Sequence, residues 1–220
     1  MTQRNYDLLI FDWDGTLANS TGMIASCVQV AAREAGLREL SFSEASFVIG
    51  LGLNEAITYL FGEGISAAQR TQMAEGYKHH YYAQDIETPL FEGAFDALIN
   101  LERLGFNLAV ATGKGRKGLN KSLELTGLNK LMKATRCVDE CPSKPNPQMI
   151  LELLEETNSL KSRALMIGDT TFDLEMAKKA GLSSLAVNYG AHNHQDLAQF
   201  NPLAHFETFA QLNNWILQNG

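Results

Sequence analysis

The stretch Leu8-Leu9-Ile10-Phe11-Asp12-Trp13-Asp14-Gly15-Thr16 decides the fold of this 220-residue chain. Its first four residues form a continuous apolar run, which is typical of a strand buried on both faces of a parallel sheet. Two aspartates, Asp12 and Asp14, follow where that strand should end. In open α/β sheets the ligand site lies outside the carboxyl ends of the strands, so both carboxylates stand where chemistry is expected.

The same alternation of apolar strands and helices continues along the chain. Further apolar runs that predict strands lie at 107–111, 164–167 and 184–187. Segments with helical spacing of apolar residues lie at 93–104, 118–125, 147–156 and 172–180. This alternation predicts an α/β fold with a three-layer, Rossmann-like core around a parallel sheet. Right-handed crossovers then bring all the strand ends to one edge.

One long connection interrupts this alternation. Residues 18–87 contain no convincing strand, and their helical segments are 24–35, 53–61 and 67–82. Because this connection far exceeds the usual loop length, it predicts a helical cap domain inserted after the first strand. The core domain is then 1–17 together with 88–220, and the cap domain is 18–87. The alternative is that these helices belong to the main layers.

Polar motifs flank the predicted strands and would meet at the same edge. They are Asp12-Trp13-Asp14-Gly15-Thr16, Thr112-Gly113-Lys114, Lys144-Pro145 and Gly168-Asp169-Thr170-Thr171-Phe172-Asp173. Each motif alone is weak, because an acidic residue at the end of a strand is often a helix cap. Their order and their common edge favour a single site.

This edge would hold up to four carboxylates, from Asp12, Asp14, Asp169 and Asp173, and unpaired carboxylates repel one another. A cation is therefore expected among them. Mg²⁺ prefers carboxylate and carbonyl oxygens, and these motifs contain no cysteine or histidine for a softer metal. Together with Lys144 and the turn after the second strand, Mg²⁺ would complete a binding site for a phosphoryl group.

These four motifs, in this order, resemble those of the haloacid dehalogenase-like (HAD) hydrolase superfamily. The likeness covers nearly the whole chain and extends to Asn188-Tyr189-Gly190 after the last predicted core strand. The chain is most similar to the capped phosphatases of that superfamily, of the phosphoglycolate phosphatase type. The resemblance implies a Mg²⁺-dependent phosphatase that hydrolyses a small-molecule phosphate monoester.

The resemblance also implies a catalytic role for five residues. Asp12 would attack phosphorus and form an aspartyl-phosphate. Asp14 would protonate the leaving oxygen and then activate water. Thr112 and Gly113 would hold phosphoryl oxygens, and Lys144 would neutralise charge on the nucleophile and the phosphoryl group. Because dehalogenases of the superfamily lack the second aspartate, Asp14 favours phosphate esters.

The metal ligands that the resemblance implies are Asp12, the backbone carbonyl of Asp14, Asp169 and Asp173. Asp173 has an alternative reading, since an acidic residue at the start of a helix also interacts with the helix dipole. Thr170 is expected to cap that helix.

The substrate stays open at this stage. Residues 40–68 contain no Lys, Arg or His that could meet a substrate carboxylate. Lys114, Arg116, Lys117 or Arg33 could supply that charge, although a solvated helix-end charge is the favoured interpretation of each. Nucleoside monophosphates, sugar phosphates and pyrophosphate therefore remain candidate substrates alongside phosphoglycolate.

The alternative activities are a phosphotransferase of the β-phosphoglucomutase type and a pyrophosphatase. A binding protein on a degenerate enzyme fold is disfavoured, because the catalytic aspartates and lysine are intact.

Composition narrows the partners and the compartment. The net charge is −7 without a basic stripe, so no nucleic acid is expected. No run reaches the roughly 20 apolar residues of a membrane span. A polar start and three scattered cysteines predict a cytoplasmic protein with reduced thiols. The pairs His79-His80 and His192-x-His194 are expected to have surface or packing roles, and the oligomeric state stays open.

Overall fold

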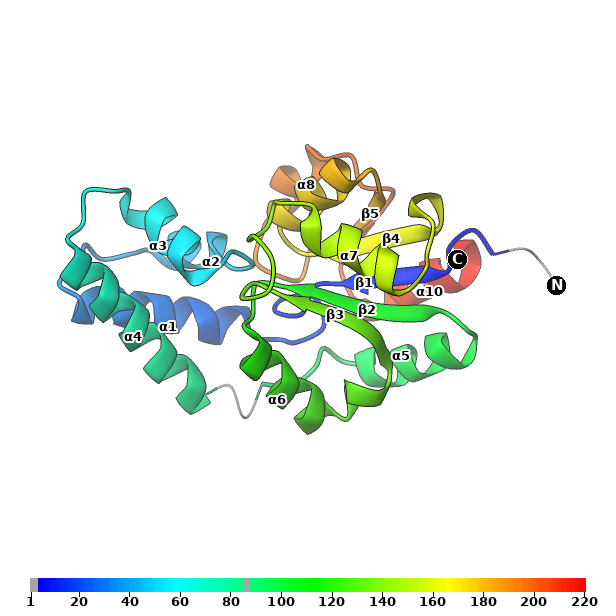
Figure 1. Cartoon of the computed structure of the whole chain (residues 1–220), viewed down its shortest axis with the longest axis horizontal. Coiled ribbons are helices and arrows are strands. Elements are labelled where there is room, and N and C mark those ends of the chain that lie inside the picture. The colour runs from blue at the N-terminus through cyan, green and yellow to red at the C-terminus, as the bar shows by residue number, and fades with distance from the viewer. Residues whose placement is uncertain (1–3, 85–87) are drawn as a thin grey trace.

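The computed structural model describes residues 4–84 and 88–220, which contain one sheet with the strand order β3-β2-β1-β4-β5-β6. The strands are β1 (Leu8–Phe11), β2 (Asn107–Thr112), β3 (Met132–Cys137), β4 (Ala164–Gly168), β5 (Ser183–Val187) and β6 (His205–Phe206). All neighbouring strands are parallel. β1 lies inside the sheet, where Phe11 pairs with Val110 of β2 and Ile167 of β4. The carboxyl ends of the strands therefore share one edge, with that of β1 between its neighbours (Figure 1).

Helices cover both faces of the sheet, as expected for a sheet buried on both sides. Leu9 and Phe11 of β1 pack into one apolar cluster with α5 (Ala94–Arg103), α6 (Arg116–Thr126) and α10 (Phe209–Asn219). Leu8 and Ile10 pack into the other with α7 (Gln148–Glu156) and α8 (Thr171–Ala180). A short helix, α9 (His194–Ala198), follows β5. No helix within the described ranges is both long and apolar enough to cross a membrane.

The predicted α/β fold is confirmed, and the four predicted strands appear within one residue of their expected ends. Two strands were missed. β3 is an edge strand in which buried and partly exposed residues are mixed, so it presents no continuous apolar run. β6 contains only two residues. Helices α9 and α10 near the carboxyl terminus were also missed, as was α2 (Phe42–Phe47) in the long connection after β1.

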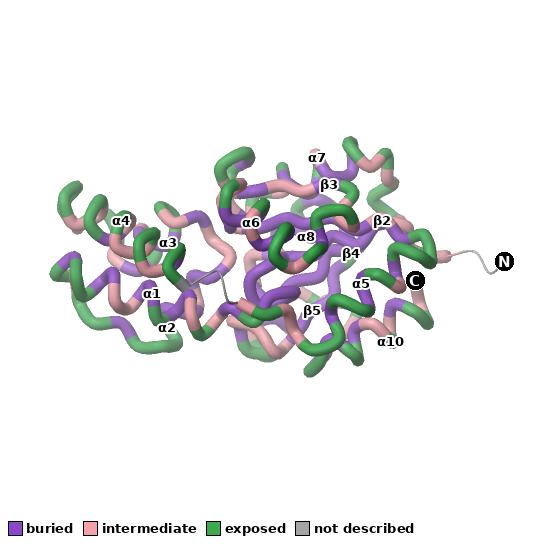
Figure 2. The backbone as a smooth tube through the Cα atoms, turned by 90° about the horizontal axis from the view of Figure 1, so that it is seen from below, coloured by how far each residue is buried: buried purple, intermediate pink, exposed green. Residues whose placement is uncertain are grey.

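Four helices follow β1 and pack mainly on one another. They are α1 (Thr21–Glu34), α2 (Phe42–Phe47), α3 (Leu53–Phe61) and α4 (Ala67–Gln84). Their apolar side chains form a cluster separate from the two that flank the sheet, and Ile57, Met73 and Ala31 are almost fully buried within it. Figures 1 and 2 show this group beside the carboxyl edge of the sheet, at the opposite end of the molecule from the two termini.

Two neighbouring segments join this helical group to the sheet. Asn19 N–H donates to the Pro89 carbonyl at 2.9 Å, and Phe91 N–H donates to the Leu17 carbonyl at 2.9 Å. The chain thus leaves and re-enters the core at one place. We propose that α1 to α4 form a cap domain, as the length of the insertion predicts. Its predicted last residue, number 87, lies outside the described residues.

A cavity-forming substitution tests whether the cap is a separate cooperative unit. Ile57→Ala removes a fully buried side chain of the cap cluster and should destabilise the cap by about 2–5 kcal/mol. We expect faster hydrogen exchange in α1 and α4, with protection in β1 and β2 retained, because local unfolding follows packing units. The matched core substitution Leu101→Ala should accelerate exchange in the sheet instead. Equal acceleration of both regions by Ile57→Ala would argue for one unit.

Candidate active site

β1 delivers Asp12 to the carboxyl edge of the sheet. Asp12 N–H donates to the Ile167 carbonyl at 2.9 Å, and the side chain is 1% exposed. The chain then turns at Gly15, whose φ of +87° is a conformation that favours glycine. A Cβ at Gly15 would also lie 2.1 Å from Asp169 Oδ2. Thr16 donates its hydroxyl to Asp169 Oδ1 at 2.8 Å, so the Asp-Gly-Thr sequence both permits and holds this close approach.

The loop after β5 holds Asp169 from the other side. Ala191 N–H donates to Asp169 Oδ2 at 2.7 Å. A Cβ at Gly190 would lie 2.2 Å from that carboxylate, so the contact requires glycine at this position. Tyr189 donates its hydroxyl to the Thr16 carbonyl at 3.1 Å and ties the two loops together. Within the Asn-Tyr-Gly sequence, Tyr189 and Gly190 therefore help to position the Asp169 carboxylate.

Three buried carboxylates meet beside one buried lysine. Ligand oxygens of Asp12, Asp169 and Asp173 all lie within 4.8 Å of one another. Lys144 Nζ lies 2.7 Å from Asp12 Oδ1 and 2.7 Å from Asp173 Oδ1. It donates a hydrogen bond to Asp173 and forms a close ion pair with Asp12 Oδ1. The other oxygen of Asp12, Oδ2, is buried without a hydrogen-bond donor among the described residues.

The electrostatics of this cluster favour a divalent cation. Burial raises the pKa of Asp12, and the charges of Asp173 and Asp169 raise it further against the opposing effect of Lys144. Burial and Asp173 raise the pKa of Asp169 to about 7. Burial alone would lower the pKa of Lys144, but Asp12 and Asp173 outweigh it and hold that pKa above its usual value. Three carboxylates facing one ammonium group, with Asp12 Oδ2 lacking a partner, fit a hard metal ion.

Asp173 serves two neighbours with its two oxygens. Oδ2 accepts from Thr170 N–H at 3.1 Å and from the Thr170 hydroxyl at 2.6 Å, while Asp173 N–H donates back to Thr170 Oγ1 at 3.3 Å. This reciprocal pair is a capping box at the start of α8. Oδ1 faces Lys144. The prediction that Thr170 is the N-cap residue of this helix is confirmed. Asp173 interacts with the start of the helix, as its alternative interpretation predicts, and also belongs to the carboxylate cluster.

Asp14 points away from the carboxylate cluster. Its Oδ1 accepts from the Ser20 hydroxyl at 2.8 Å and from Lys114 Nζ at 3.3 Å. The backbone N–H of Lys114 in turn donates to Thr112 Oγ1 at 3.1 Å, so the Thr112 side chain stabilises the turn after β2. Lys114 is 6% exposed, and its Nζ lies 4.6 Å above the Tyr81 ring of α4. Asp14 thus lies between the core and the cap.

A cavity of about 530 Å³ opens over Asp12 and Asp14. Its floor includes Thr112, Gly113 and Lys114 of the core. The cap contributes residues of α1, the loop between α2 and α3, the start of α3, and five residues of α4, which are Ala74, Tyr77, Lys78, Tyr81 and Tyr82. This enclosure gives room for a small leaving group next to the two aspartates.

The family model of the haloacid dehalogenase-like hydrolases matches residues 9–187, which is most of the chain and includes the motifs that carry Asp12, Thr112, Lys144 and Asp169. The chain belongs to this family. It is therefore an enzyme of the hydrolase class.

Relatives of this hydrolase span almost its full length. A phosphoglycolate phosphatase from Vibrio parahaemolyticus is 29% identical over 213 residues, covering 92% of each chain. A pyrophosphatase, PpaX, from Halalkalibacterium halodurans is 27% identical over 195 residues, covering 88% of this chain and 89% of its own. The crystal structure of a hydrolase from Pseudomonas syringae matches with a TM-score of 0.88 at 20% identity, covering 97% of this chain and 98% of that one. That structural match bears on the fold alone.

The residues that the sequence singled out in this hydrolase gather at one edge. Lys144 contacts Asp12 and Asp173, whose carboxylate oxygens lie within 4.8 Å of each other and of Asp169. The predicted phosphate-binding residues Thr112 and Gly113 line the cavity beside them. The carboxylate of Asp14 stands outside the cluster, so a metal contact from Asp14 would have to use its backbone carbonyl, as expected.

Sequence reasoning undervalued Lys114 and missed Ser20. The solvated helix-end reading is wrong for Lys114, which is buried against Asp14, but Lys117 and Arg33 are exposed. Arg116 pairs with Glu140 at 2.7 Å. Nothing around Ser20 forms a motif, because its hydrogen bond to Asp14 depends on how the chain enters α1.

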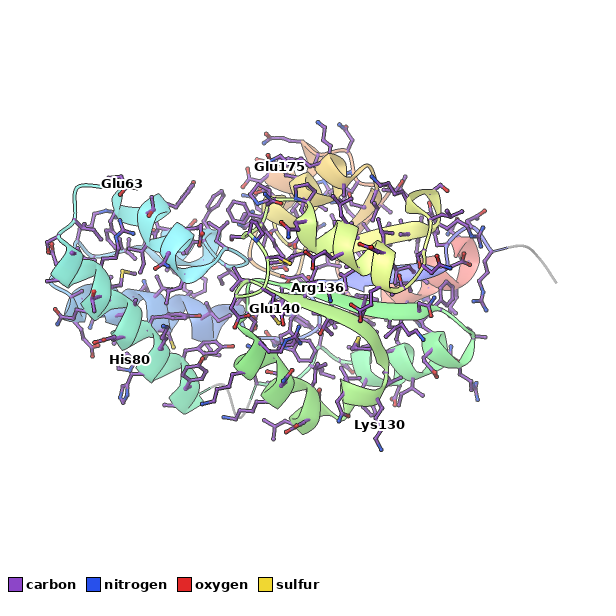
Figure 3. All side chains as sticks on the ribbon, viewed as in Figure 1. Glu63, His80, Lys130, Arg136, Glu140 and Glu175 are labelled. Atoms are coloured by element: carbon purple, nitrogen blue, oxygen red, sulfur yellow. The ribbon has the colours of Figure 1, made fainter. Side chains whose placement is uncertain are left out.

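The two histidine pairs differ in their surroundings. Figure 3 shows His80 on the outer side of α4, and its Nε2 lies 2.9 Å from the Glu34 carboxylate. Lys130 and Glu63 likewise project outward in that view. His192, in contrast, is 3% exposed and lies between the core and the cap. The expected surface role fits His80, and the expected packing role fits His192.

Metal removal should destabilise this hydrolase in a pH-dependent way. A carboxyl group whose folded pKa is raised from 3.8 to about 7, as at Asp169, binds more protons in the folded than in the unfolded chain between these values. The metal-free protein should therefore lose stability as the pH rises through this window. Since a metal ion competes with these protons, the difference in Tm between Mg²⁺ and EDTA should widen from about pH 5.5 to about pH 8.

Thermal denaturation at both pH values measures this difference. Asp169→Asn should abolish most of its pH dependence, whereas Asp96→Asn on the exposed side of α5 should leave it unchanged. A Tm difference that is constant with pH in the unsubstituted protein would contradict the assignment of a metal to this cluster.

Proposed function

We propose that this hydrolase is a Mg²⁺-dependent phosphatase that cleaves a small-molecule phosphate monoester through an aspartyl-phosphate on Asp12. The observation that carries the proposal is the state of Asp12. Its carboxylate is buried at the end of β1 and opens onto the cavity; Oδ1 contacts Lys144 at 2.7 Å, and Oδ2 has no hydrogen-bond donor within the described ranges. A carboxylate used only for structure would normally have donors for both oxygens at this depth.

In the first half-reaction a carboxylate oxygen of Asp12 forms a bond to phosphorus, and the bond from phosphorus to the ester oxygen breaks. Asp14 gives its proton to that leaving oxygen, so the alcohol departs neutral. Its position on the cavity side of the nucleophile, held by Ser20, supports this role. The product of this step is an aspartyl-phosphate and a released alcohol.

In the second half-reaction water replaces the alcohol. Asp14, now a carboxylate, takes a proton from water, whose oxygen bonds to phosphorus as the bond from phosphorus to Asp12 breaks. Inorganic phosphate leaves, and both aspartates return to their starting states. One residue can serve both steps because the incoming water occupies the place of the departed oxygen.

The remaining core residues would hold the phosphoryl group. Thr112 and the backbone N–H of Gly113 lie on the cavity floor and can donate to phosphoryl oxygens. Lys144, already in contact with Asp12, offsets negative charge that accumulates as phosphorus is transferred. In phosphoryl transfer most of the rate acceleration comes from positioning and electrostatics of this kind.

The residues that would hold Mg²⁺ are Asp12, Asp169, Asp173 and the backbone carbonyl of Asp14. A bound Mg²⁺ would neutralise charge on the phosphoryl oxygens and orient them toward Asp12. The chain itself holds the carboxylate oxygens of the proposed metal ligands close together. Thr16 and Ala191 hold Asp169, and the capping box of α8 holds Asp173.

Lys114 favours a leaving group that carries negative charge. Its ammonium lies at the cavity beside Asp14, on the side from which the alcohol departs. Phosphoglycolate and pyrophosphate, the substrates in the names of two relatives, share such a group, a carboxylate in one case and a phosphate in the other. We propose a small anionic phosphate ester of the phosphoglycolate kind as substrate, with pyrophosphate as the second candidate.

A phosphotransferase of the β-phosphoglucomutase type remains the alternative reaction. In that case a sugar hydroxyl, rather than water, would capture the aspartyl-phosphate. Release of inorganic phosphate from a panel of esters and pyrophosphate, in the absence of a sugar acceptor, separates the two reactions. We further propose a cytoplasmic location, which fits three cysteines that form no disulfide in the described structure.

Replacement of the nucleophile tests the mechanism. Asp12→Asn keeps the size of the side chain but removes the nucleophilic carboxylate, so Mg²⁺-dependent phosphate release should fall by more than about 10³-fold. Acid-quenched protein should also carry no phosphate. The control is Asp96→Asn, an exposed aspartate of α5, which should keep full activity. Substantial turnover by Asp12→Asn would rule out the aspartyl-phosphate.

Replacement of Lys114 tests the substrate class. A hydrogen bond between charged groups is worth about 1.5–3 kcal/mol, so Lys114→Met should raise the KM for phosphoglycolate about 10- to 100-fold relative to ethyl phosphate. Ethyl phosphate has nearly the same length but lacks the carboxylate. Lys117→Met, at an exposed position of α6, is the matched control. An equal effect on both esters would show that Lys114 acts on the reacting groups and not on the carboxylate.

A further inference from the structure

His192 lies buried at the junction of core and cap, with both ring nitrogens engaged. Thr171 N–H donates to Nδ1 at 3.0 Å, which makes Nδ1 the acceptor and leaves the ring proton on Nε2. Nε2 then donates to the Phe47 carbonyl at 2.8 Å. The first contact belongs to the core and the second to the cap, so a single neutral imidazole bridges the two.

The ring of His192 is also packed between aromatic rings of both parts. It stacks on Phe47 of α2 with centroids 4.3 Å apart and an angle of 12° between the planes. Phe172 of α8 meets it edge-on at 5.3 Å, and meets Phe47 at 5.8 Å. The direction of the hydrogen bond to Phe47 is therefore fixed by packing on both sides.

Each end of this bridge leads directly to the active site. Phe47 is the last residue of α2 and precedes the loop 48–53, which lines the cavity. Within that loop Gly50 approaches the core closely, since a Cβ on Gly113 would lie 2.5 Å from the Gly50 carbonyl oxygen. On the core side, His192 N–H donates to the carbonyl of Asp169 at 3.2 Å.

We propose that His192 is a positioning residue that docks the end of α2 onto the loop carrying Asp169, and so sets the cavity wall formed by residues 48–53. The carbonyl of Phe47 stands at the end of a helix, where carbonyl groups lack partners within the helix. His192 supplies that partner from the core. The docking itself does not depend on the proposed reaction, but its effect on catalysis rests on the proposed function.

Two substitutions separate the two hydrogen bonds of His192. The polar atoms of asparagine reach about as far as Nδ1, and those of glutamine about as far as Nε2. His192→Asn should therefore keep the contact with Thr171 and lose the one with Phe47, whereas His192→Gln should keep the contact with Phe47. A residue that serves only for packing would be affected similarly by both changes.

Hydrogen exchange of the Gly52 amide reports docking directly, because this amide donates to Ser143 Oγ of the core at 2.8 Å. We expect His192→Asn to speed its exchange about 3- to 10-fold, the effect of losing one hydrogen bond, and His192→Gln to leave it near the unsubstituted rate. Amides of β1 serve as the control for global unfolding and should keep their protection in both variants.

Activity provides an independent readout. In His192→Asn the KM for the best phosphate ester should rise while the Asp12 phosphorylation level at saturation is retained, and His192→Gln should restore the KM. Since exchange is measured without substrate, a protein that releases no phosphate would refute the proposed function and leave the docking test intact.

Four outcomes would overturn the proposal. They are equal acceleration of Gly52 exchange by the two variants, acceleration by neither, acceleration by His192→Gln alone, and simultaneous loss of amide protection in β1 and at Gly52 in His192→Asn.

As a second approach from the cap side, Phe47→Ala removes the stacking ring and leaves His192 intact. It should accelerate Gly52 exchange while the Tm difference between Mg²⁺ and EDTA stays unchanged, and normal Gly52 exchange in this variant would likewise count against docking at this point.

Discussion

The arrangement of the active edge depends on the way one buried ammonium group holds two buried carboxylates. Lys144 Nζ is equidistant from Asp12 and Asp173, at 2.7 Å from each. Without it, two like charges at this depth would repel strongly and would be buried without an opposite charge. The lysine therefore couples the end of β1 to the start of α8. Because phosphoryl transfer gains most of its rate from prearranged charges, this coupling places the proposed nucleophile before substrate arrives.

Such close packing of carboxylates constrains the backbone around them. Gly15, Gly168 and Gly190 each lie so near Asp169 or Asp173 that a Cβ would come within 2.1 to 2.4 Å of the acidic side chain. A sheet edge alone does not create this density. This close packing requires glycine where three loops converge. These glycines therefore allow the carboxylates to approach one another, in addition to any role in the turns.

How far sequence reasoning reached follows from the range of the interactions. The strand ending at Asp12 and the helix beginning after Thr170 were predictable, because an apolar run and a capping box are local signals. The edge strand β3 was not, because its mixture of buried and partly exposed residues follows from its place in the sheet. Ser20 and His192 were also beyond reach, since their partners lie in separate elements that only the folded chain brings together.

The two buried lysines differ in what fixes their positions, and this difference gives the cap a role in selection. Within the part of the chain that the structure describes, Lys144 forms ion pairs with Asp12 and Asp173, which both belong to the core, so these contacts on the phosphoryl side of the site do not involve the cap. Lys114 lies 4.6 Å above Tyr81 of α4, so the proposed leaving-group side is complete only when the cap is docked. A contact that holds the cap, such as that of His192 with Phe47, would then favour substrates whose leaving group uses Lys114. Docking of the cap and binding of an anionic leaving group would thus be thermodynamically coupled, because an anion bound at Lys114 stabilises the same docked cap that His192 stabilises.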